Sequence, residues 1–226
     1  DLHSFPTRRS SDLVQPTILV LVALIMYTVS GIAYRWFSTI LALLAGSSML
    51  VLSVIRFVGV EKFSQIPVFG YVAKRFSAFF NPFNDLAGAG HQLANSYYAM
   101  VNGGWFGLGL GNSIEKRGYL PEAHTDFVFS IVIEEFGFVG ASMILALLFF
   151  LILRIILVGI RAKDPFNSMF AIGVGGMILV QVFVNIGGIS GLIPSTGVTF
   201  PFLSQGGNSL LVLSVAIAFV RSEEHT

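Results

Sequence analysis

The chain has 226 residues, of which 54% are hydrophobic and 11% are charged, whereas about 25% of the residues of a typical soluble domain are charged. Its composition and mean hydropathy of +0.81 exclude intrinsic disorder. It has no cysteine, which excludes a disulfide framework and a cysteine zinc site. Its formal net charge of +1 argues against nucleic acid as a partner. Several apolar runs reach the roughly 18 residues that indicate a transmembrane helix. The sequence therefore predicts an all-α, polytopic integral membrane helical bundle.

The two ends of the chain differ in character from the rest. Residues 1–13 read DLHSFPTRRSSDL and residues 221–226 read RSEEHT, and neither continues the apolar pattern beside it. We interpret both as translated sequencing-adapter DNA, which should be set aside before the fold is considered. On this interpretation the native part is 14–220. The alternative is a basic juxtamembrane arm and a polar tail.

Six transmembrane spans are expected along the chain. They cover about 17–33, 37–57, 86–106, 137–160, 166–186 and 208–220. A polar and aromatic stretch over 61–85 is expected to lie on the membrane surface. The span over 86–106 carries polar residues such as Gln92 and Ser96, so it must face the bundle interior or a water-filled cavity on one side.

Basic residues set the expected orientation of the spans. Counting hairpins places seven on one side: Arg56, Lys62, Lys74, Arg75, Arg154, Arg161 and Lys163. The other side has three: Arg35, Lys116 and Arg117. The positive-inside rule assigns the larger group to the cytoplasm. The loops over 107–125 and 189–205 are therefore both expected outside.

The densest group of ionisable residues falls in the outside loop over 107–125 and at the start of a short helix expected over 126–135. Thr125 is placed to cap that helix, so that Asp126 would lie in its first turn, where the helix dipole favours an ionised carboxylate. From spacing alone, Asp126 serves equally well to start the helix or as a functional carboxylate. Lys116 is a candidate partner for an anionic group such as a phosphate, or a surface charge.

Two further acids, Glu134 and Glu135, follow on the same expected helix. At about 100° per residue, Glu134 is about 80° from Asp126, and Glu135 lies on the opposite face. Glu134 could therefore lean toward the same cleft. The spacing nevertheless favours solvated acids at a helix end for both.

Two glycine patterns predict close packing. The run GGWFGLGLG over 103–111 is no dinucleotide fingerprint, because no strand precedes it and no βαβ unit follows. It predicts a kinked helix end at which the backbone closely approaches a neighbour or a ligand. Gly173 and Gly176 stand three residues apart in an apolar span, which simple helix packing explains.

A series of ordered motifs runs through 85–220. They are GNS at 111–113 followed by Lys116, YLPEAHTDF at 119–127, EEFG at 134–137, NIG at 185–187, PSTG at 194–197 and PFLSQGG at 201–207, with Gln92, Ser96, Ala99, Gly103 and Gly104 upstream. Together they closely resemble the signature of the FtsW/RodA/SpoVE (SEDS) family. The alanine in LPEAHTDF is more like the division members of that family than the elongation members. Gln205 departs from the family, which often has Tyr there.

The resemblance implies an inverting peptidoglycan glycosyltransferase that polymerises lipid II into glycan strands during septal cell-wall synthesis. It implies a multi-pass protein of the bacterial cytoplasmic membrane with its active site on the outer face. Family members have about ten spans, so the six expected here would form the C-terminal part of the domain, and the fragment itself is expected to be inactive. The implied partners are lipid II, a class B penicillin-binding protein, other division proteins and the lipid bilayer.

The resemblance also assigns roles to residues. The essential acid of the family corresponds to Asp126, which would act as general base toward the attacking 4-hydroxyl. Lys116, alone or with a divalent cation such as Mg²⁺ or Mn²⁺, would neutralise the departing diphosphate. The other substrate-binding candidates are Gln92, Ser96, Glu122, His124 and Thr125, and no residue is assigned to a metal. Two alternatives stay open, namely a lipid II flippase and a non-enzymatic division scaffold that recruits a penicillin-binding protein.

Overall fold

Helices make up all of the regular structure in the part of the chain that the computed structural model describes. The described residues are 11–29, 38–39, 42–43, 46, 49–50, 53, 79–80, 82–83, 90–121, 123–205 and 207–224. Most of the expected span over 37–57 and of the surface stretch over 61–85 lies outside them. The all-α prediction is confirmed for the described residues.

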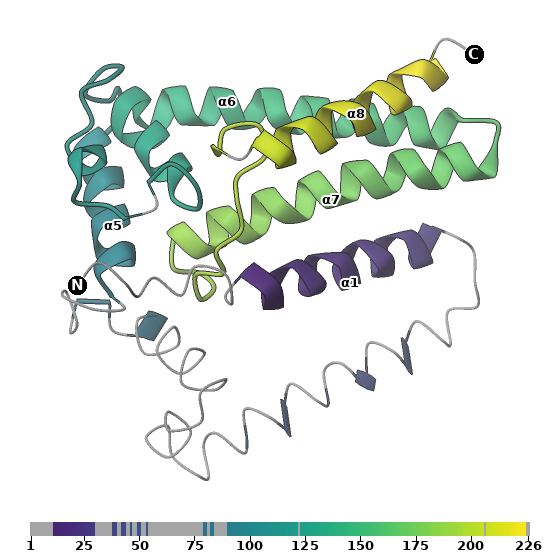
Figure 1. The fold of residues 1–226 in the computed structure, drawn as a ribbon, viewed down its shortest axis with the longest axis horizontal. Helices are drawn as coiled ribbons and strands as arrows, with labels where there is room; N and C mark the ends of the chain where they lie inside the picture. The colour runs from purple at the N-terminus through teal and green to yellow at the C-terminus, as the bar shows by residue number, and fades with distance from the viewer. Residues whose placement is uncertain are drawn as a thin grey trace.

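Among the described residues, four α-helices run lengthwise and one stands across an end of the bundle (Figure 1). The lengthwise helices are α1 (Ser11–Val29), α6 (Val128–Arg161), α7 (Pro165–Ile189) and α8 (Gly207–Glu224). The crossing helix is α5 (His91–Gly103), which packs near the start of α6. A short 3-10 turn, η1 (Glu115–Arg117), lies in the loop between α5 and α6.

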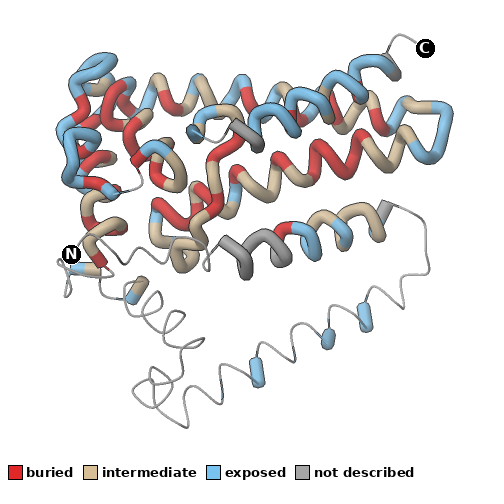
Figure 2. The backbone as a smooth tube through the Cα atoms, viewed as in Figure 1, coloured by how far each residue is buried: buried red, intermediate tan, exposed pale blue. Residues whose placement is uncertain are grey.

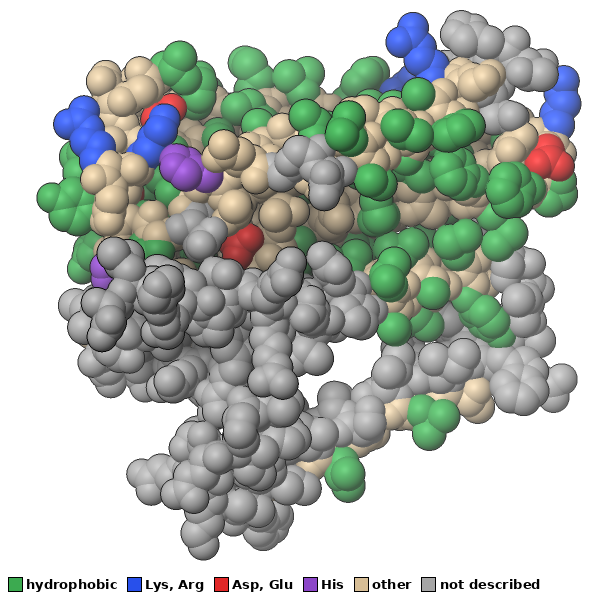
Figure 3. Space-filling model, viewed as in Figure 1, with side chains coloured by type: hydrophobic (Ala, Val, Ile, Leu, Met, Phe, Trp, Pro, Cys, Tyr) green, Lys and Arg blue, Asp and Glu red, His purple; other side chains and the backbone are tan. Residues whose placement is uncertain are grey.

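Two of these helices, α6 and α7, are long and apolar enough to cross a membrane. Shorter apolar helical stretches cover Ile18–Thr28 in α1 and Ser209–Ser222 in α8. Helix α6 is interrupted at Gly137, and at about 1.5 Å per residue the stretch over 138–161 after that break would extend about 36 Å, enough to cross the roughly 30 Å hydrocarbon core of a bilayer. Figure 3 shows hydrophobic side chains along the length of the bundle, with Lys and Arg side chains gathered at its two ends. This distribution is typical of an integral membrane protein.

The buried core follows the contact between α6 and α7, with α5 closing one end (Figure 2). Glycines allow the helices to approach closely, because a Cβ at Gly175 would lie 2.8 Å from Ile156 Cγ1 of α6. A Cβ at Gly173 would lie 3.1 Å from the Met26 sulfur, and one at Gly176 would lie 3.3 Å from Ile25. The packing role predicted for Gly173 and Gly176 is therefore confirmed, with α1 as the neighbour.

The hairpin between α6 and α7 ends in a capped helix start. Asp164 is the N-cap of α7, where its Oδ2 accepts a hydrogen bond of 3.1 Å from the Asn167 backbone N–H. Pro165 follows in the first turn, where a missing N–H costs nothing. The cap fixes where α7 begins, and α7 then runs to the site described next.

Candidate active site

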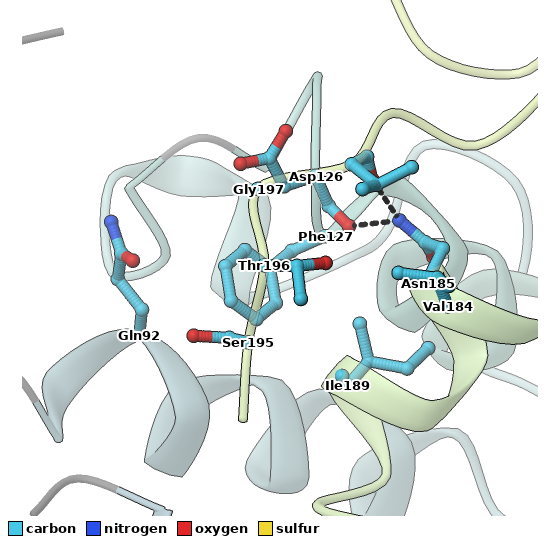
Figure 4. Close-up of a pocket in the computed structure, with 11 residues that line it drawn as sticks. Gln92, Asp126, Phe127, Val184, Asn185, Ile189, Ser195, Thr196 and Gly197 are labelled. Carbon is cyan, nitrogen blue, oxygen red and sulfur yellow. Dashed lines mark hydrogen bonds between the residues drawn. The ribbon is translucent and has the colours of Figure 1, made fainter. Parts of the chain in front are cut away.

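A cavity lies where α5, the start of α6, the end of α7 and the segment before α8 meet. Its polar lining includes Gln92, Asp126, Asn185, Ser195 and Thr196. Figure 4 shows Gln92 and Asn185 on opposite sides of the view, with Asp126 and Thr196 between them. The structure thus brings together Gln92 and Asp126, two of the residues predicted for a site, from parts of the chain that are far apart in sequence.

Asp126 lies before the helix and not in its first turn. Helix α6 begins at Val128 with Phe127 as its N-cap, and the Phe127 carbonyl accepts the first intrahelical bonds, from Ser130 N at 3.0 Å and Ile131 N at 3.5 Å. The prediction that Thr125 caps the helix is therefore wrong. The reason is tertiary, because the carbonyls of the preceding residues accept hydrogen bonds from other parts of the chain.

Three successive carbonyls before α6 are held in this way. The His124 carbonyl accepts a hydrogen bond of 2.8 Å from the Gln205 backbone N–H. The Thr125 carbonyl accepts one of 2.5 Å from the Ser204 hydroxyl, and the Asp126 carbonyl accepts one of 2.7 Å from Asn185 Nδ2. The segment that carries Asp126 is therefore fixed to the end of α7 and to the loop before α8.

Asn185 is a site residue that the sequence reasoning noted only within a motif. Its side chain is buried at 4% exposure, and its Nδ2 donates to the carbonyls of Asp126 and of Val198, the latter at 2.6 Å. Because both partners can only accept, the amide nitrogen must face them. Its Oδ1 is buried and has no hydrogen-bond partner, which costs about 1–3 kcal/mol. A polar side chain inside an apolar span was the signal that could have found it.

Ser204 connects the loop before α8 to the segment before α6. Its hydroxyl donates to the Thr125 carbonyl and accepts a hydrogen bond of 2.7 Å from the Phe200 N–H. The turn between Phe200 and Ser204 contains Phe202 at φ +65°, a left-handed conformation that is uncommon for a residue other than glycine. Phe200 is buried and stacks on Phe129 of α6 with ring centroids 4.8 Å apart. The turn is thus anchored on both sides of its strained residue.

The remaining predicted site residues lie apart from the cavity lining or serve to pack it. Ser96 is fully buried, and its hydroxyl donates to the Ile189 carbonyl at 3.1 Å, which fastens α5 to the end of α7. Lys116 pairs with Glu135 at 3.5 Å and is 45% exposed. His124 is exposed and Thr125 is half-buried. Glu122 lies outside the described residues.

The glycine-rich loop after α5 packs against a break in α6. Gly137 has φ +70° and ψ 179°, so the helix is interrupted there. The break leaves backbone groups on both sides without helical partners, and the loop supplies them. Leu108 N and Gly109 N donate to the carbonyls of Glu134 and Glu135, and Phe138 N and Val139 N donate to those of Gly104 and Trp105. The predicted close backbone approach is confirmed, and the neighbour is α6.

Glu134 and Glu135 are not solvated acids. Glu134 is 0% exposed, and its carboxylate accepts hydrogen bonds from the Ser113 hydroxyl and from the Ile114 N–H. Glu135 is 7% exposed and pairs with Lys116. Nearby, burial raises the pKa of Glu115 and the Glu134 charge raises it further. The acids are buried because the glycine-rich loop covers this part of α6.

The described residues offer no ready metal site. Among them, no three His, Asp or Glu side chains are grouped so that they could hold a metal ion. Asp126 is the acid in the cavity lining, and the neighbouring polar groups there are amides and hydroxyls. The described residues therefore form no all-protein metal cage. What the arrangement supplies is one carboxylate beside groups that bind hydroxyls, and Mg²⁺ is commonly held by one or two carboxylates together with substrate phosphates.

Comparison with known proteins places the chain in a well-defined group. The cell cycle protein family of FtsW, RodA and SpoVE matches residues 9–225. A relative from Lactococcus lactis subsp. lactis, named "Probable peptidoglycan glycosyltransferase FtsW", is 58% identical over 92% of this chain and 50% of its own length. A relative of the same name from Bacillus subtilis is 43% identical over 87% of this chain and 47% of its own. The chain thus spans about half the length of the curated relatives it matches.

A solved structure has a similar fold. It is described as "Structural coordination of polymerization and crosslinking by a peptidoglycan synthase complex". The TM-score is 0.64 at 24% sequence identity, and the match covers 92% of this chain and 55% of that one. At this identity the likeness shows the fold alone.

Proposed function

The chain belongs to the FtsW/RodA/SpoVE family, an integral membrane protein family, and on that premise we propose that the protein carrying it is a peptidoglycan glycosyltransferase. It would polymerise lipid II into glycan strands during septal cell-wall synthesis. The observation that carries the proposal is Asp126, a carboxylate in the lining of a polar cavity on a backbone held at three successive carbonyls. The names of the relatives support the same activity.

In the proposed reaction Asp126 acts as general base. It takes the proton from the 4-hydroxyl of the acceptor sugar while that oxygen forms a bond to the anomeric carbon of the donor. The bond from that carbon to the undecaprenyl diphosphate breaks in the same step, so the configuration inverts. General base catalysis of this kind contributes about 10²–10⁴-fold to the rate.

The other predicted residues have supporting roles in this proposal. Gln92, which lines the cavity from α5, would contact the sugar. Lys116 would exchange its exposed pairing with Glu135 for the departing diphosphate. Glu122, His124 and Thr125 complete the proposed substrate contacts around Asp126, with Ser96 holding the α5 wall of the cavity in place. At the diphosphate, Lys116 would act alone or together with a divalent cation such as Mg²⁺ or Mn²⁺.

The proposal includes a topology. About six spans of a domain of about ten would lie in this chain, with 107–125 and 189–205 on the outer face of a bacterial cytoplasmic membrane. The described basic residues support this orientation. Arg161 ends α6 and Lys163 lies in the turn before α7, whereas Lys116 and Arg117 lie in η1, in the loop after α5. Figure 1 shows that the turn between α6 and α7 lies at the other end of the bundle from α5. The lipid tail would lie between spans, and the proposed protein partners are a class B penicillin-binding protein and other division proteins.

The test uses the full-length protein that contains this segment, purified with its class B penicillin-binding protein and given labelled lipid II. The parent should produce a ladder of glycan strands, and Asp126→Asn should produce none while keeping the parent's melting temperature. Polymerisation by the variant at the parent's rate would overturn the assignment of the base. If neither makes a ladder, lipid II movement in vesicles would distinguish a flippase from a scaffold. The segment 14–220 alone should make no polymer.

A further inference from the structure

The segment that carries Asp126 depends on distant parts of the chain for its conformation. It lies outside α6, so its carbonyls have no helical partners. Asn185 lies 59 residues beyond Asp126, and Ser204 lies 79 residues beyond Thr125. Both donors are side chains, and each could be removed by one substitution without changing the amino-acid sequence of the segment that carries Asp126.

Each of the two side chains contacts both the segment that carries Asp126 and the segment before α8. Asn185 Nδ2 joins the Asp126 carbonyl to the Val198 carbonyl, and Val198 belongs to the segment over 195–198 that also lines the cavity. Ser204 joins the Thr125 carbonyl to the Phe200 N–H in the same segment before α8. The backbone next to Asp126 is therefore fixed to the segment before α8 by two side chains.

The contacts come with unfavourable features that packing alone would not select. Asn185 keeps a buried Oδ1 without a partner, and Phe202 keeps a left-handed conformation beside Ser204. Strained residues and unpaired buried groups are tolerated where the surrounding structure must hold a particular geometry. Here the geometry that is held is the backbone next to Asp126.

We propose that Asn185 and Ser204 are positioning residues, which hold Asp126 at its reacting distance from the sugar hydroxyl by tying the backbone at 125–126 to the segment over 198–200. The inference rests on the proposed function. It assigns these residues no contact with the reacting atoms. A misplacement of about 1 Å can lower a rate by about 10²-fold, so the loss of either bridge should affect the chemical step more than substrate binding.

The test compares four variants of the full-length protein with its penicillin-binding protein on labelled lipid II. Ser204→Ala and Asn185→Leu should each lower kcat by about 10²-fold and leave KM within about twofold of the parent. Ser204→Thr keeps the hydroxyl and should restore kcat to within about threefold of the parent. The control is Ser130→Ala in α6, which removes a buried hydroxyl that has no hydrogen-bond partner and should leave kcat unchanged.

Hydrogen exchange measures the proposed bridge without catalysis. Peptides covering 123–128 should exchange faster in Ser204→Ala and Asn185→Leu than in the parent and Ser130→Ala. A parent that makes no polymer would overturn the proposed function. A parent that polymerises, with both variants at its kcat or with KM raised at unchanged kcat, would overturn the positioning role alone. An equal loss of kcat in Ser130→Ala would also overturn it, because any change in the buried core would then have the same effect.

Discussion

The first turns of α6 are flanked by two regions that differ in how completely their polar groups are hydrogen-bonded. At the Gly137 break, the glycine-rich loop supplies a hydrogen bond to each of four backbone groups that the break exposes, and the Glu134 carboxylate beneath it is fully paired. Around Asp126, the backbone is equally well held, but a cavity remains, Asn185 Oδ1 has no partner and Phe202 is strained. The fully hydrogen-bonded region has a structural role. The region around Asp126 has space and an unpaired polar atom with which a ligand can form contacts.

The largest effect expected from this contrast follows from Gly137→Ala. The residue has φ +70°, and an added Cβ would overlap backbone atoms of Trp105, Phe106 and Gly107, which cannot move without breaking the hydrogen bonds across the break. We expect a loss of about 4 kcal/mol or more in unfolding free energy, and therefore a melting temperature far below the parent's. The measurement is thermal unfolding of the purified protein in detergent.

The matched control for that substitution is Gly111→Ala. Gly111 also has a positive φ, +82°, but nothing lies within 4 Å of a Cβ added there. It should cost only about 1–2 kcal/mol for the left-handed conformation. Equal losses in the two variants would show that the cost at Gly137 comes from the backbone conformation and not from the close approach of the loop to α6.

The second prediction separates the buried acid Glu134 from the cavity acid Asp126. Glu134→Ala leaves the Ser113 hydroxyl and the Ile114 N–H buried without their acceptor, which should cost about 2–4 kcal/mol and lower the melting temperature and activity together. Asp126→Asn should abolish polymerisation at an unchanged melting temperature. If the two variants lose stability to the same extent, the division into a structural acid and a functional acid is wrong.

A smaller effect on stability is expected at Lys116. Its pairing with Glu135 is half-exposed, so Lys116→Met should change the unfolding free energy by about 0.2–1 kcal/mol. Because the proposal assigns Lys116 to the diphosphate, kcat/KM should fall by about tenfold to hundredfold. Arg117→Met, another loop cation nearby, is the control and should keep the parent's kcat/KM. Full activity of Lys116→Met would contradict the proposed contact between Lys116 and the diphosphate.

Local patterns in the sequence predicted the parts of this structure that depend on local physics. The apolar runs predicted helices close to the bounds of α7 and α8. The expected short helix over 126–135 and the expected span over 137–160 correspond to the two parts of α6 on either side of the Gly137 break. The glycines over 103–111 predicted a close backbone approach. What the sequence did not reveal is which surface would cover which residue. Glu134 was predicted to be solvated, but a loop about 20 residues earlier in the chain covers it. Thr125 was predicted to cap the helix, but its carbonyl accepts a hydrogen bond from Ser204. Asn185 joins two segments in the same way, and no periodicity records such pairings.

The smallest effect concerns Glu115, which lies in the glycine-rich region yet resembles the cavity in having an unpaired buried atom. Its side chain is 7% exposed, and its Oε2 has no hydrogen-bond partner. Burial, and then the Glu134 charge, raise the pKa of Glu115 above its usual value of 4.5. Between the unfolded and the folded pKa, the folded state binds more protons than the unfolded state. Stability therefore decreases as the pH rises through that interval and is greatest below about pH 4.5.

Replacing this carboxyl should remove that pH dependence. Glu115→Gln cannot ionise, so its melting temperature should exceed the parent's by a few degrees at pH 8, where the parent must bury a charge, and the difference should vanish toward pH 4. Thermal unfolding across pH 4–9 measures both limits. Glu135→Gln should behave oppositely at pH 8, because its charge is paired with Lys116 and losing it removes a favourable contact. A constant offset in melting temperature between Glu115→Gln and the parent at every pH would mean that the effect arises from packing and not from the ionisation of Glu115.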